Sequence, residues 1–270
     1  MINPEKYDML LQWLGRLESA AIAFSGGVDS TFLLATADKV LGKKVIAFTV
    51  KTPYIPDWEV EEAIAFCRER SINQRIIQAE MLPAIANNPE NRCYLCKKHI
   101  FAVLKEEAQK DGYTSLLDGT NYDDNGIYRP GLAALKELGI SSPLLENGIT
   151  KAEVRHFSSE LGLPTADKPS YACLLTRLPY EYTVKNEELR RIEKAERFLA
   201  SIGFAASRVR NHNNIARIEI EKERLTELLQ PETAARVVSR FHELGYEFIT
   251  IDMEGFRSGS FDTNKKQAPT

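Results

Sequence analysis

The chain has 270 residues, of which 43% are hydrophobic, and a formal net charge of −3. This length allows one large domain with a buried core and a second, smaller one. The nearly balanced charge argues against a protein that coats DNA or an anionic membrane. The longest apolar runs are far too short to span a bilayer, and the first residues lack the apolar segment of a signal peptide. We therefore expect a cytoplasmic protein with neither membrane nor nucleic acid as its partner.

The first two thirds of the sequence alternate short apolar strands with amphipathic helices. Continuous apolar strands separated by such helices are typical of an α/β fold with a doubly wound parallel sheet. The predicted strands are 20–24, 45–50, 74–78, 115–118 and 143–144, and the predicted helices are 30–40, 59–70, 98–110 and 151–161.

The pattern changes near residue 180. The expected elements there are a helix over 189–202, strands over 208–211 and 215–220, a helix to about 244 and a strand over 248–251. This order predicts a small α+β domain. We assign residues 1–180 to the α/β domain, and residues 181–270 to a small domain for substrate binding or oligomerisation.

The strongest motif is Phe24-Ser25-Gly26-Gly27-Val28-Asp29-Ser30, between the first predicted strand and its helix. Two glycines let the backbone turn tightly and present N–H groups to phosphate oxygens, and the helix N-terminus adds positive potential. The Ser25 and Ser30 hydroxyls can donate hydrogen bonds, and Asp29 can hold a magnesium ion that bridges phosphates. The loop is not a Walker A motif; its spacing resembles the PP-loop of enzymes that cleave ATP between the α and β phosphates. A Gly-Gly turn with a serine cap is the alternative without a ligand.

The cysteines form a second candidate site. Four cysteines in a cytoplasmic chain indicate metal or redox chemistry sooner than disulfides. Cys93, Cys96 and Cys173 are expected on loops that meet at the carboxyl edge of the sheet, beside the nucleotide. Three thiolates suit a 4Fe-4S cluster with one open iron. Zinc, a Cys93–Cys96 redox pair and no stable metal are the alternatives, and Cys67 has the helical spacing of a core residue.

A third candidate region covers residues 117–124, at the end of a predicted strand. Gly119 and Asn121 can contact the adenosine, Asp123 or its neighbour can add a magnesium contact, and Arg129 can meet a phosphate. An ordinary Asx-rich turn is the alternative.

The small domain carries a fourth signal. Arg208 and Arg210 alternate on one predicted strand and so face the same side, with Glu219 on the partner strand. Gly255-Phe256-Arg257-Ser258-Gly259-Ser260 has the donors and glycines of an anion nest. Singly these are typical solvated charges; together they predict a pocket for a phosphorylated, carboxylate-bearing substrate. The predicted substrate contacts are Arg208, Arg210, Glu219, Arg257, Ser258 and Ser260.

The order of the motifs resembles the LarE family over nearly the whole chain. The motifs are Ser25-Gly26-Gly27-Val28-Asp29-Ser30, Cys93-x-x-Cys96, Gly119-Thr120-Asn121, Arg129-Pro130-Gly131, Lys151-Ala152-Glu153-Val154-Arg155, Lys168-Pro169-Ser170, Ala172-Cys173-Leu174 and the segment 255–260. That family makes the thiolated pincer ligand of the nickel cofactor of lactate racemase. The resemblance implies an ATP-dependent sulfur transferase that adenylates a carboxylate of a pyridinium dicarboxylate mononucleotide and inserts sulfur to give a thiocarboxylate. It also implies a metal contact at Glu196.

The resemblance implies two routes for the sulfur. Some family members sacrifice the sulfur of the cysteine at the position of Cys173, whereas others hold a 4Fe-4S cluster with three cysteines. This chain has all three, so the resemblance favours the cluster version, with Cys93, Cys96, Cys173 and Asp29 as the catalytic set and sulfide or another sulfur donor as a partner. It leaves a homo-oligomer open.

Two other functions are compatible with the same motifs. A tRNA thiolation enzyme would use the same loop and cysteines, but it is expected to carry a basic surface for RNA. A non-catalytic iron–sulfur or redox-sensing protein would bind ATP without turning it over.

Overall fold

The computed structural model describes residues 2–125 and 130–257. It divides into two compact units, each built around its own core. Unit 1 comprises Met1–Ile85 and Asn91–Tyr171, and unit 2 comprises Ala86–Glu90 and Ala172–Thr270. The composition change near residue 180 gave no sign that a short piece from the middle of unit 1 packs with the C-terminal part.

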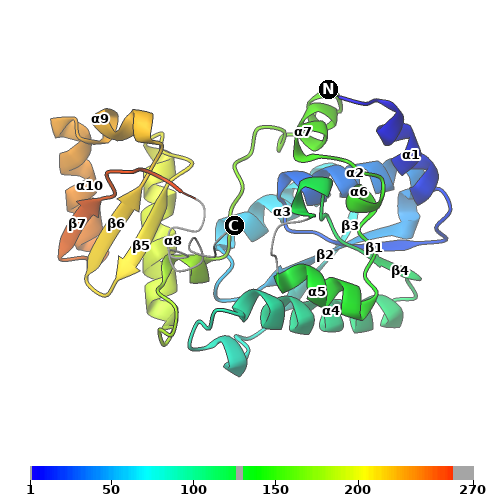
Figure 1. The fold of residues 1–270 in the computed structure, drawn as a ribbon, viewed down its shortest axis with the longest axis horizontal. Coiled ribbons are helices and arrows are strands. Elements are labelled where there is room, and N and C mark those ends of the chain that lie inside the picture. The colour runs from blue at the N-terminus through cyan, green and yellow to red at the C-terminus, as the bar shows by residue number, and fades with distance from the viewer. Residues whose placement is uncertain (1, 126–129, 258–270) are drawn as a thin grey trace, which may run out of the picture. The chain divides into compact units, whose positions relative to one another are not determined.

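Unit 1 alternates strands and helices as the sequence predicts (Figure 1). Its elements are α1 (Glu5–Leu14), β1 (Ala20–Ala23), α2 (Val28–Leu41), β2 (Val45–Lys51), α3 (Asp57–Glu69), β3 (Asn73–Gln78), α4 (Arg92–Lys110), β4 (Ser115–Leu117), α5 (Pro130–Leu138), α6 (Pro143–Glu146) and α7 (Lys151–Glu160), with short 3-10 helices at Gly42–Lys44, Pro83–Ile85 and Tyr122–Asp124.

The four strands form a parallel sheet in the order β3-β2-β1-β4. The chain adds β2 and β3 on one side of β1 and then returns to add β4 on the other side. The strand order therefore reverses between β1 and β4, and ligands of open α/β sheets bind in the crevice at such a reversal. The fold class is α/β, as predicted.

Helices cover both faces of this sheet (Figure 1). On one face, Ile22 of β1 lies in a buried cluster with Phe32 of α2 and Phe157 of α7. On the other face, Phe48 of β2 packs with Phe101 of α4. Because both faces are buried at the centre of the sheet, β1 and most of β2 are continuously apolar and do not alternate, whereas the edge strand β3 has the sequence Asn-Gln-Arg-Ile-Ile-Gln and is at most half-buried.

The predicted strand at 143–144 is wrong. Pro143 begins α6, where the fixed φ of proline suits the first helical turn. The chain touches the sheet just before this helix, through a single parallel bridge between Ser141 and Leu117.

Unit 2 has the predicted helix, hairpin, helix and strand. Its elements are a 3-10 helix (Leu174–Arg177), α8 (Asn186–Ser201), β5 (Arg208–His212), β6 (Ile215–Glu219), a 3-10 helix (Lys222–Arg224), α9 (Leu225–Leu228), α10 (Pro231–Glu243) and β7 (Phe248–Ile251). β5 and β6 are antiparallel, whereas β7 lies parallel to β6 at the edge. Leu199 of α8 and Phe241 of α10 pack on this sheet.

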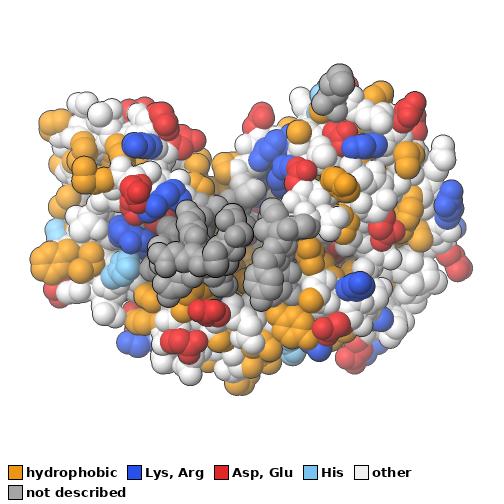
Figure 2. All heavy atoms as spheres, viewed as in Figure 1, with side chains coloured by type: hydrophobic (Ala, Val, Ile, Leu, Met, Phe, Trp, Pro, Cys, Tyr) orange, Lys and Arg blue, Asp and Glu red, His pale blue; other side chains and the backbone are white. Residues whose placement is uncertain are grey.

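No helix within the described ranges is both long and apolar enough to cross a membrane. On the face shown in Figure 2, acidic and basic side chains are interspersed, in keeping with the net charge of −3.

Candidate active site

The loop between β1 and α2 requires glycine at one position. Gly26 has a φ of 71°, in the left-handed region, and a Cβ there would lie 3.3 Å from the Cβ of Ala63. Gly27 is the extended N-cap of α2 and provides no side-chain cap. The first N–H groups of α2 are therefore available to an anion.

Two serine hydroxyls brace this loop. Ser25 Oγ lies 3.1 Å from Ser30 Oγ and accepts a hydrogen bond from the Gly27 N–H at 3.3 Å. Ser30 Oγ donates to the Gly27 carbonyl oxygen at 3.2 Å. The predicted nucleotide-loop residues thus lie together in one turn at the carboxyl end of β1.

Asp29, in the first turn of α2, is contacted by residues from two later loops. One oxygen forms an ion pair with Nζ of Lys151, the first residue of α7, and the other accepts from Nδ2 of Asn121 at 3.1 Å. Asp123 lies beside them, because its Oδ2 accepts the backbone N–H of Lys151 at 2.8 Å. The fold thus brings the ammonium of Lys151 to Asp29, although the two residues are far apart in the sequence.

The two carboxylates fit magnesium by their chemistry. Magnesium is usually bound by one or two carboxylates together with substrate phosphate oxygens and water. Asp29 and Asp123 provide such carboxylates beside the loop that would hold the phosphates. Across residues 2–125 and 130–257, no three His, Cys, Asp or Glu side chains could hold a metal ion by themselves.

Gly119 lets the loop after β4 approach the start of α2. A Cβ at this position would lie 2.9 Å from the backbone nitrogen of Ser30 and 3.2 Å from the carbonyl carbon of Asp29. Any larger residue would separate the two loops that flank the strand reversal. Asp118 is buried and accepts a hydrogen bond from Thr120 Oγ1 at 2.7 Å, so it braces this loop from inside.

Lys168 is a candidate site residue that the sequence analysis named only as part of a motif, without a role. Its Nζ donates to the carbonyl oxygen of Gly26 at 2.9 Å, pairs with Glu62 at 2.6 Å and lies 5.7 Å from the centre of the Trp58 ring. Arg155 holds the same segment by donating to the carbonyl of Lys168 at 2.9 Å. Nothing in the sequence around a lysine in a polar loop distinguishes a site residue from a solvent-exposed charge. Only the tertiary contact with Gly26 indicates a role for Lys168.

Cys93 and Cys96 lie within the first five residues of α4 and not on a loop, which corrects the prediction. Their spacing places both on one side of the helix. Cys96 Sγ is 3.3 Å from the hydroxyl of Tyr54. Burial raises the pKa of the Cys96 thiol, and the hydrogen bond with Tyr54 offsets part of that rise. Cys93 is exposed.

Cys173 belongs to unit 2, where it precedes the 3-10 helix Leu174–Arg177. Its carbonyl oxygen accepts from the backbone N–H and the hydroxyl of Thr176, at 3.1 and 2.9 Å. Cys67 is in the core, as predicted, and burial raises its pKa to about 12. None of the four cysteines forms a disulfide. Cys93, Cys96 and Cys173 form no disulfide and are at least partly accessible. Three thiolates are the ligand number of a cluster with one open iron, but within the described ranges no three His, Cys, Asp or Glu side chains are grouped so as to hold a metal ion.

In unit 2, the predicted substrate residues include a buried ion-pair network. Arg210 on β5 donates two hydrogen bonds to Glu219 on β6, at 3.0 and 2.8 Å, and Arg217 adds a third at 3.1 Å. Glu219 has no exposed surface. Its carboxylate therefore balances two guanidinium groups, a role that the alternation of charges along the strands does not reveal.

Arg257 lies after β7 and is less constrained. Its Nη2 is 2.5 Å from a carboxylate oxygen of Glu254 and 3.9 Å from one of Asp252. The guanidinium of Arg208 lies 5.0 Å from the centre of the Phe256 ring, so β5 and the segment that carries Arg257 are neighbours. The other predicted contacts Arg129, Ser258 and Ser260 lie outside the described residues.

Glu196 on α8 is engaged on both oxygens. It accepts from Nε and Nη2 of Arg177 at 2.8 and 3.0 Å, and from the backbone N–H of Val209 at 2.8 Å. The side chains of Arg177 and Glu196 are 1% and 5% exposed. A metal contact at Glu196 would require this pair to open.

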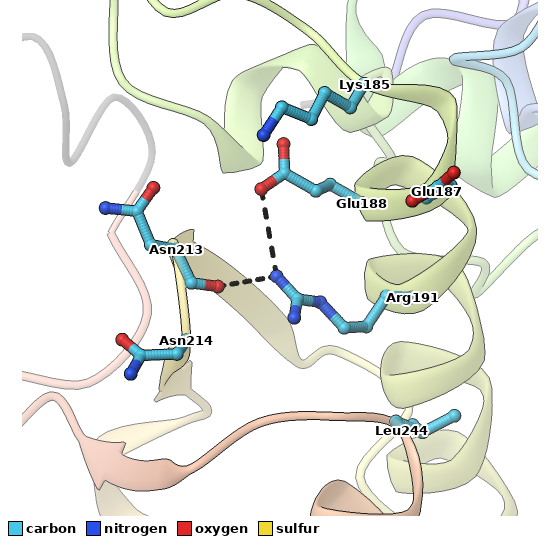
Figure 3. Close-up of a pocket in the computed structure, with 7 residues that line it drawn as sticks. All are labelled: Lys185, Glu187, Glu188, Arg191, Asn213, Asn214 and Leu244. Atoms are coloured by element: carbon cyan, nitrogen blue, oxygen red, sulfur yellow. Dashed lines mark hydrogen bonds and ion pairs between the residues drawn. The ribbon is translucent and has the colours of Figure 1, made fainter.

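A pocket of about 440 Å³ lies elsewhere in unit 2 (Figure 3). Arg191 points into it but is held by the carbonyl oxygen of Asn213, with Glu188 at 3.8 Å and the Tyr246 ring centre at 4.3 Å. No predicted site residue lines this pocket.

Comparison with known proteins identifies the family. No family model matches the chain. An uncharacterized protein of Synechocystis sp. is 40% identical over 95% of this chain and 97% of its own length. The pyridinium-3,5-bisthiocarboxylic acid mononucleotide synthase of Lactiplantibacillus plantarum is 34% identical, over 97% of this chain and 96% of its own. One of the subunits of the glutamine-hydrolyzing GMP synthase of Thermoplasma acidophilum is also 34% identical, but over 56% of this chain and 53% of its own. Because the alignment with the Lactiplantibacillus synthase spans nearly the whole of both proteins, the chain belongs to the LarE family, the family of that synthase.

Proposed function

We propose that this protein is an ATP-dependent sulfur transferase that converts a carboxylate of a pyridinium mononucleotide into a thiocarboxylate, with AMP and pyrophosphate as the other products. The observation that carries the proposal is the convergence of Lys151 and Asn121 on Asp29, beside an uncapped helix N-terminus at the strand reversal. The name of the Lactiplantibacillus relative describes a mononucleotide that carries two thiocarboxylic acid groups.

The first step uses residues of unit 1. ATP binds with its phosphates against the N–H groups of residues 25–30. Asp29 and Asp123 would hold magnesium, which would neutralise phosphate charge. A carboxylate oxygen of the substrate attacks the α-phosphorus, the bond from this phosphorus to the α–β bridging oxygen breaks, and pyrophosphate leaves. Lys151 gives up its ion pair with Asp29 and stabilises the negative charge of the leaving group.

The second step joins sulfur to the activated acyl carbon. A sulfur nucleophile attacks this carbon, the carbon–oxygen bond to AMP breaks, and the thiocarboxylate remains. Cys93, Cys96 and Cys173 would hold a 4Fe-4S cluster, which would supply an open iron for the transferred sulfide. The task of the chain is to hold the acyl adenylate and the sulfur source close together.

Unit 2 would bind the mononucleotide. Arg208 and Arg257 are the proposed contacts for its phosphate and free carboxylate, because guanidinium groups match both anions. Arg210 supports this assignment from within unit 2, since it also donates to the carbonyl oxygen of Thr176, in the turn that follows Cys173. The strand that carries Arg208 and Arg210 is therefore hydrogen-bonded to the segment that follows Cys173.

The test is an anaerobic reaction with ATP, magnesium, sulfide and a pyridinium dicarboxylate mononucleotide. We expect AMP and pyrophosphate in equal amounts, a thiocarboxylate product by mass, and about four iron atoms per chain, as a cubane requires. Pyrophosphate release that no carboxylate stimulates would refute the proposal. Salt-sensitive binding and thiolation of tRNA would support the tRNA enzyme instead.

Single cysteine variants separate the two sulfur routes. If the three thiolates hold one cluster, Cys93→Ala, Cys96→Ala and Cys173→Ala should each lose most bound iron and nearly the same activity. If Cys173 gives up its own sulfur, Cys173→Ala should be far worse than the other two. The wild-type chain should then also lose one sulfur and two hydrogen atoms in mass after a single turnover.

A further inference from the structure

The segment Ala86–Glu90 packs with unit 2, although the chain on both sides of it belongs to unit 1. Three hydrogen bonds join it to residues 181–184. They run from the Val184 N–H to the Ala86 carbonyl at 2.8 Å, from the Glu181 N–H to the Asn88 carbonyl at 3.3 Å, and between Thr183 Oγ1 and Asn87 Oδ1 at 3.2 Å. A loop of the α/β part is thus built into unit 2.

Asn88 is the centre of this connection. Its side chain is fully buried, and its φ of 49° is a left-handed value that asparagine tolerates better than most residues. Its Nδ2 donates to the carbonyl oxygens of Leu175 at 3.2 Å, Leu178 at 3.1 Å and Pro179 at 2.7 Å. Two N–H groups are shared among three acceptors, so this amide holds the turn that begins at Cys173.

The same segment leads into the other two cysteines. Cys93 follows Asn88 by five residues, and five residues of extended chain reach at most about 18 Å, whatever the arrangement of the two units. Leu175, which accepts from Asn88, is two residues after Cys173. The chain passes between the units at 85–86, 90–91 and 171–172, and the last two of these passages are each followed within three residues by a cysteine.

We propose that Asn88 is a positioning residue that ties the approach to Cys93 and Cys96 to the turn of Cys173, and so keeps the three thiols within working distance of one another. Its chemical purpose rests on the proposed function, in which these thiols act as one set. The approach of the thiols to one another can be measured without iron or turnover, so the two hypotheses can fail separately.

Two substitutions break this tie, and the first of them leaves the side-chain volume nearly unchanged. Asn88→Asp places a carboxylate oxygen where Nδ2 now donates, against three carbonyl oxygens. Asn88→Gly removes the side chain but keeps the left-handed backbone accessible. Asn213→Asp is the matched control, because Asn213 also has a left-handed φ, 59°, but is exposed in unit 2. Its Oδ1 accepts from the Tyr182 hydroxyl, a bond that aspartate can keep.

The experiment treats the full-length, iron-free protein with a short bis-maleimide and maps the cross-linked peptides by mass spectrometry. We expect cross-links from Cys173 to Cys93 or Cys96 in the wild type and in Asn213→Asp. The yield should fall by about fivefold or more in both Asn88 variants, because the effective concentration of the thiols drops. ATP affinity should be unchanged, since the nucleotide loop lies in unit 1. After anaerobic reconstitution, the Asn88 variants should also retain less iron than the wild type.

Equal cross-linking in the wild type and the Asn88 variants would overturn the inference, as would a wild type in which Cys173 reaches neither partner. A wild type that cross-links in an Asn88-dependent way but binds no iron would refute the cluster and leave the positioning role standing. If Asn88→Asp does not fold, Asn88→Gly decides.

Discussion

Replacing Glu196 by alanine should destabilise unit 2 by about 3–5 kcal/mol, the range seen when one partner of a buried ion pair is removed. The structure supports this magnitude because the variant would leave the guanidinium of Arg177 buried without its carboxylate. It would also leave the Val209 N–H without its acceptor, and an unsatisfied buried N–H alone costs about 1–3 kcal/mol. The two losses share one side chain, so they are not added.

Hydrogen exchange followed by mass spectrometry is the suitable assay, because both tryptophans, Trp13 and Trp58, lie in unit 1 and do not report on unit 2. Each 1.4 kcal/mol is a factor of ten, so peptides from α8 and β5 should exchange between about a hundredfold and several thousandfold faster. Glu187→Ala, an exposed position on the same helix, should change little. Glu196→Gln should fall between the two, since it keeps an acceptor for Val209.

Two results would refute this account. A loss of less than about 1 kcal/mol would show that the pair contributes no more than a surface ion pair. If a metal chelator destabilised the wild type and left Glu196→Ala unaffected, the carboxylate would serve a metal ion and not Arg177.

Asp29→Asn should abolish ATP-dependent pyrophosphate release with little change in Tm, because it removes a carboxylate and no core volume; normal release would exclude the magnesium role. Lys168→Met should raise the KM for ATP more than it lowers kcat, since its Nζ supports the carbonyl of Gly26; an unchanged KM would contradict this. Burial raises the pKa of Glu153, but hydrogen bonds from Lys6 and from backbone N–H groups outweigh it and lower the pKa to about 2. Because the folded pKa lies below the ordinary value of 4.5, this stabilisation is complete above about pH 4.5 and is lost as the pH falls toward 2. The denaturation midpoint of Glu153→Gln should therefore change less with pH than that of the wild type between about pH 4.5 and 2. Equal changes in the two proteins would contradict this role of the Glu153 carboxylate.

The class of the fold could be predicted because buried parallel strands have a signature that depends on few neighbours. β1 is Ala-Ala-Ile-Ala and is covered on both faces, so its apolar character is continuous. The same signature led to the wrong prediction of a strand at 143–144, where two apolar residues lie buried in a short helix that begins at a proline. Short apolar runs do not distinguish a strand from a buried helical turn.

The turn at residues 24–30 could be predicted because its residues are contiguous, whereas the contacts around it could not. The pair of Asp29 with Lys151 and the bond from Lys168 to Gly26 join residues more than a hundred positions apart. Cys93 and Cys96 were predicted on a loop because residues 87–92, just before them, are rich in Asn and Pro, whereas α4 already begins at Arg92. The burial of Arg210 and Glu219 was hidden for another reason, since each charge is neutralised by a residue on the facing strand.

The segment 86–90 also constrains the order in which the parts of the protein can fold. Domains tend to fold from the N-terminus as they leave the ribosome. Asn88 emerges long before residues 175–179, whose carbonyl groups it binds in the finished protein. Until then, this loop of the growing α/β unit has no docking site, and a protein truncated after residue 171 would keep it in that state. Unit 2 expressed alone would in turn leave three carbonyl oxygens without the amide that joins them, so no single cut in the chain yields two intact halves.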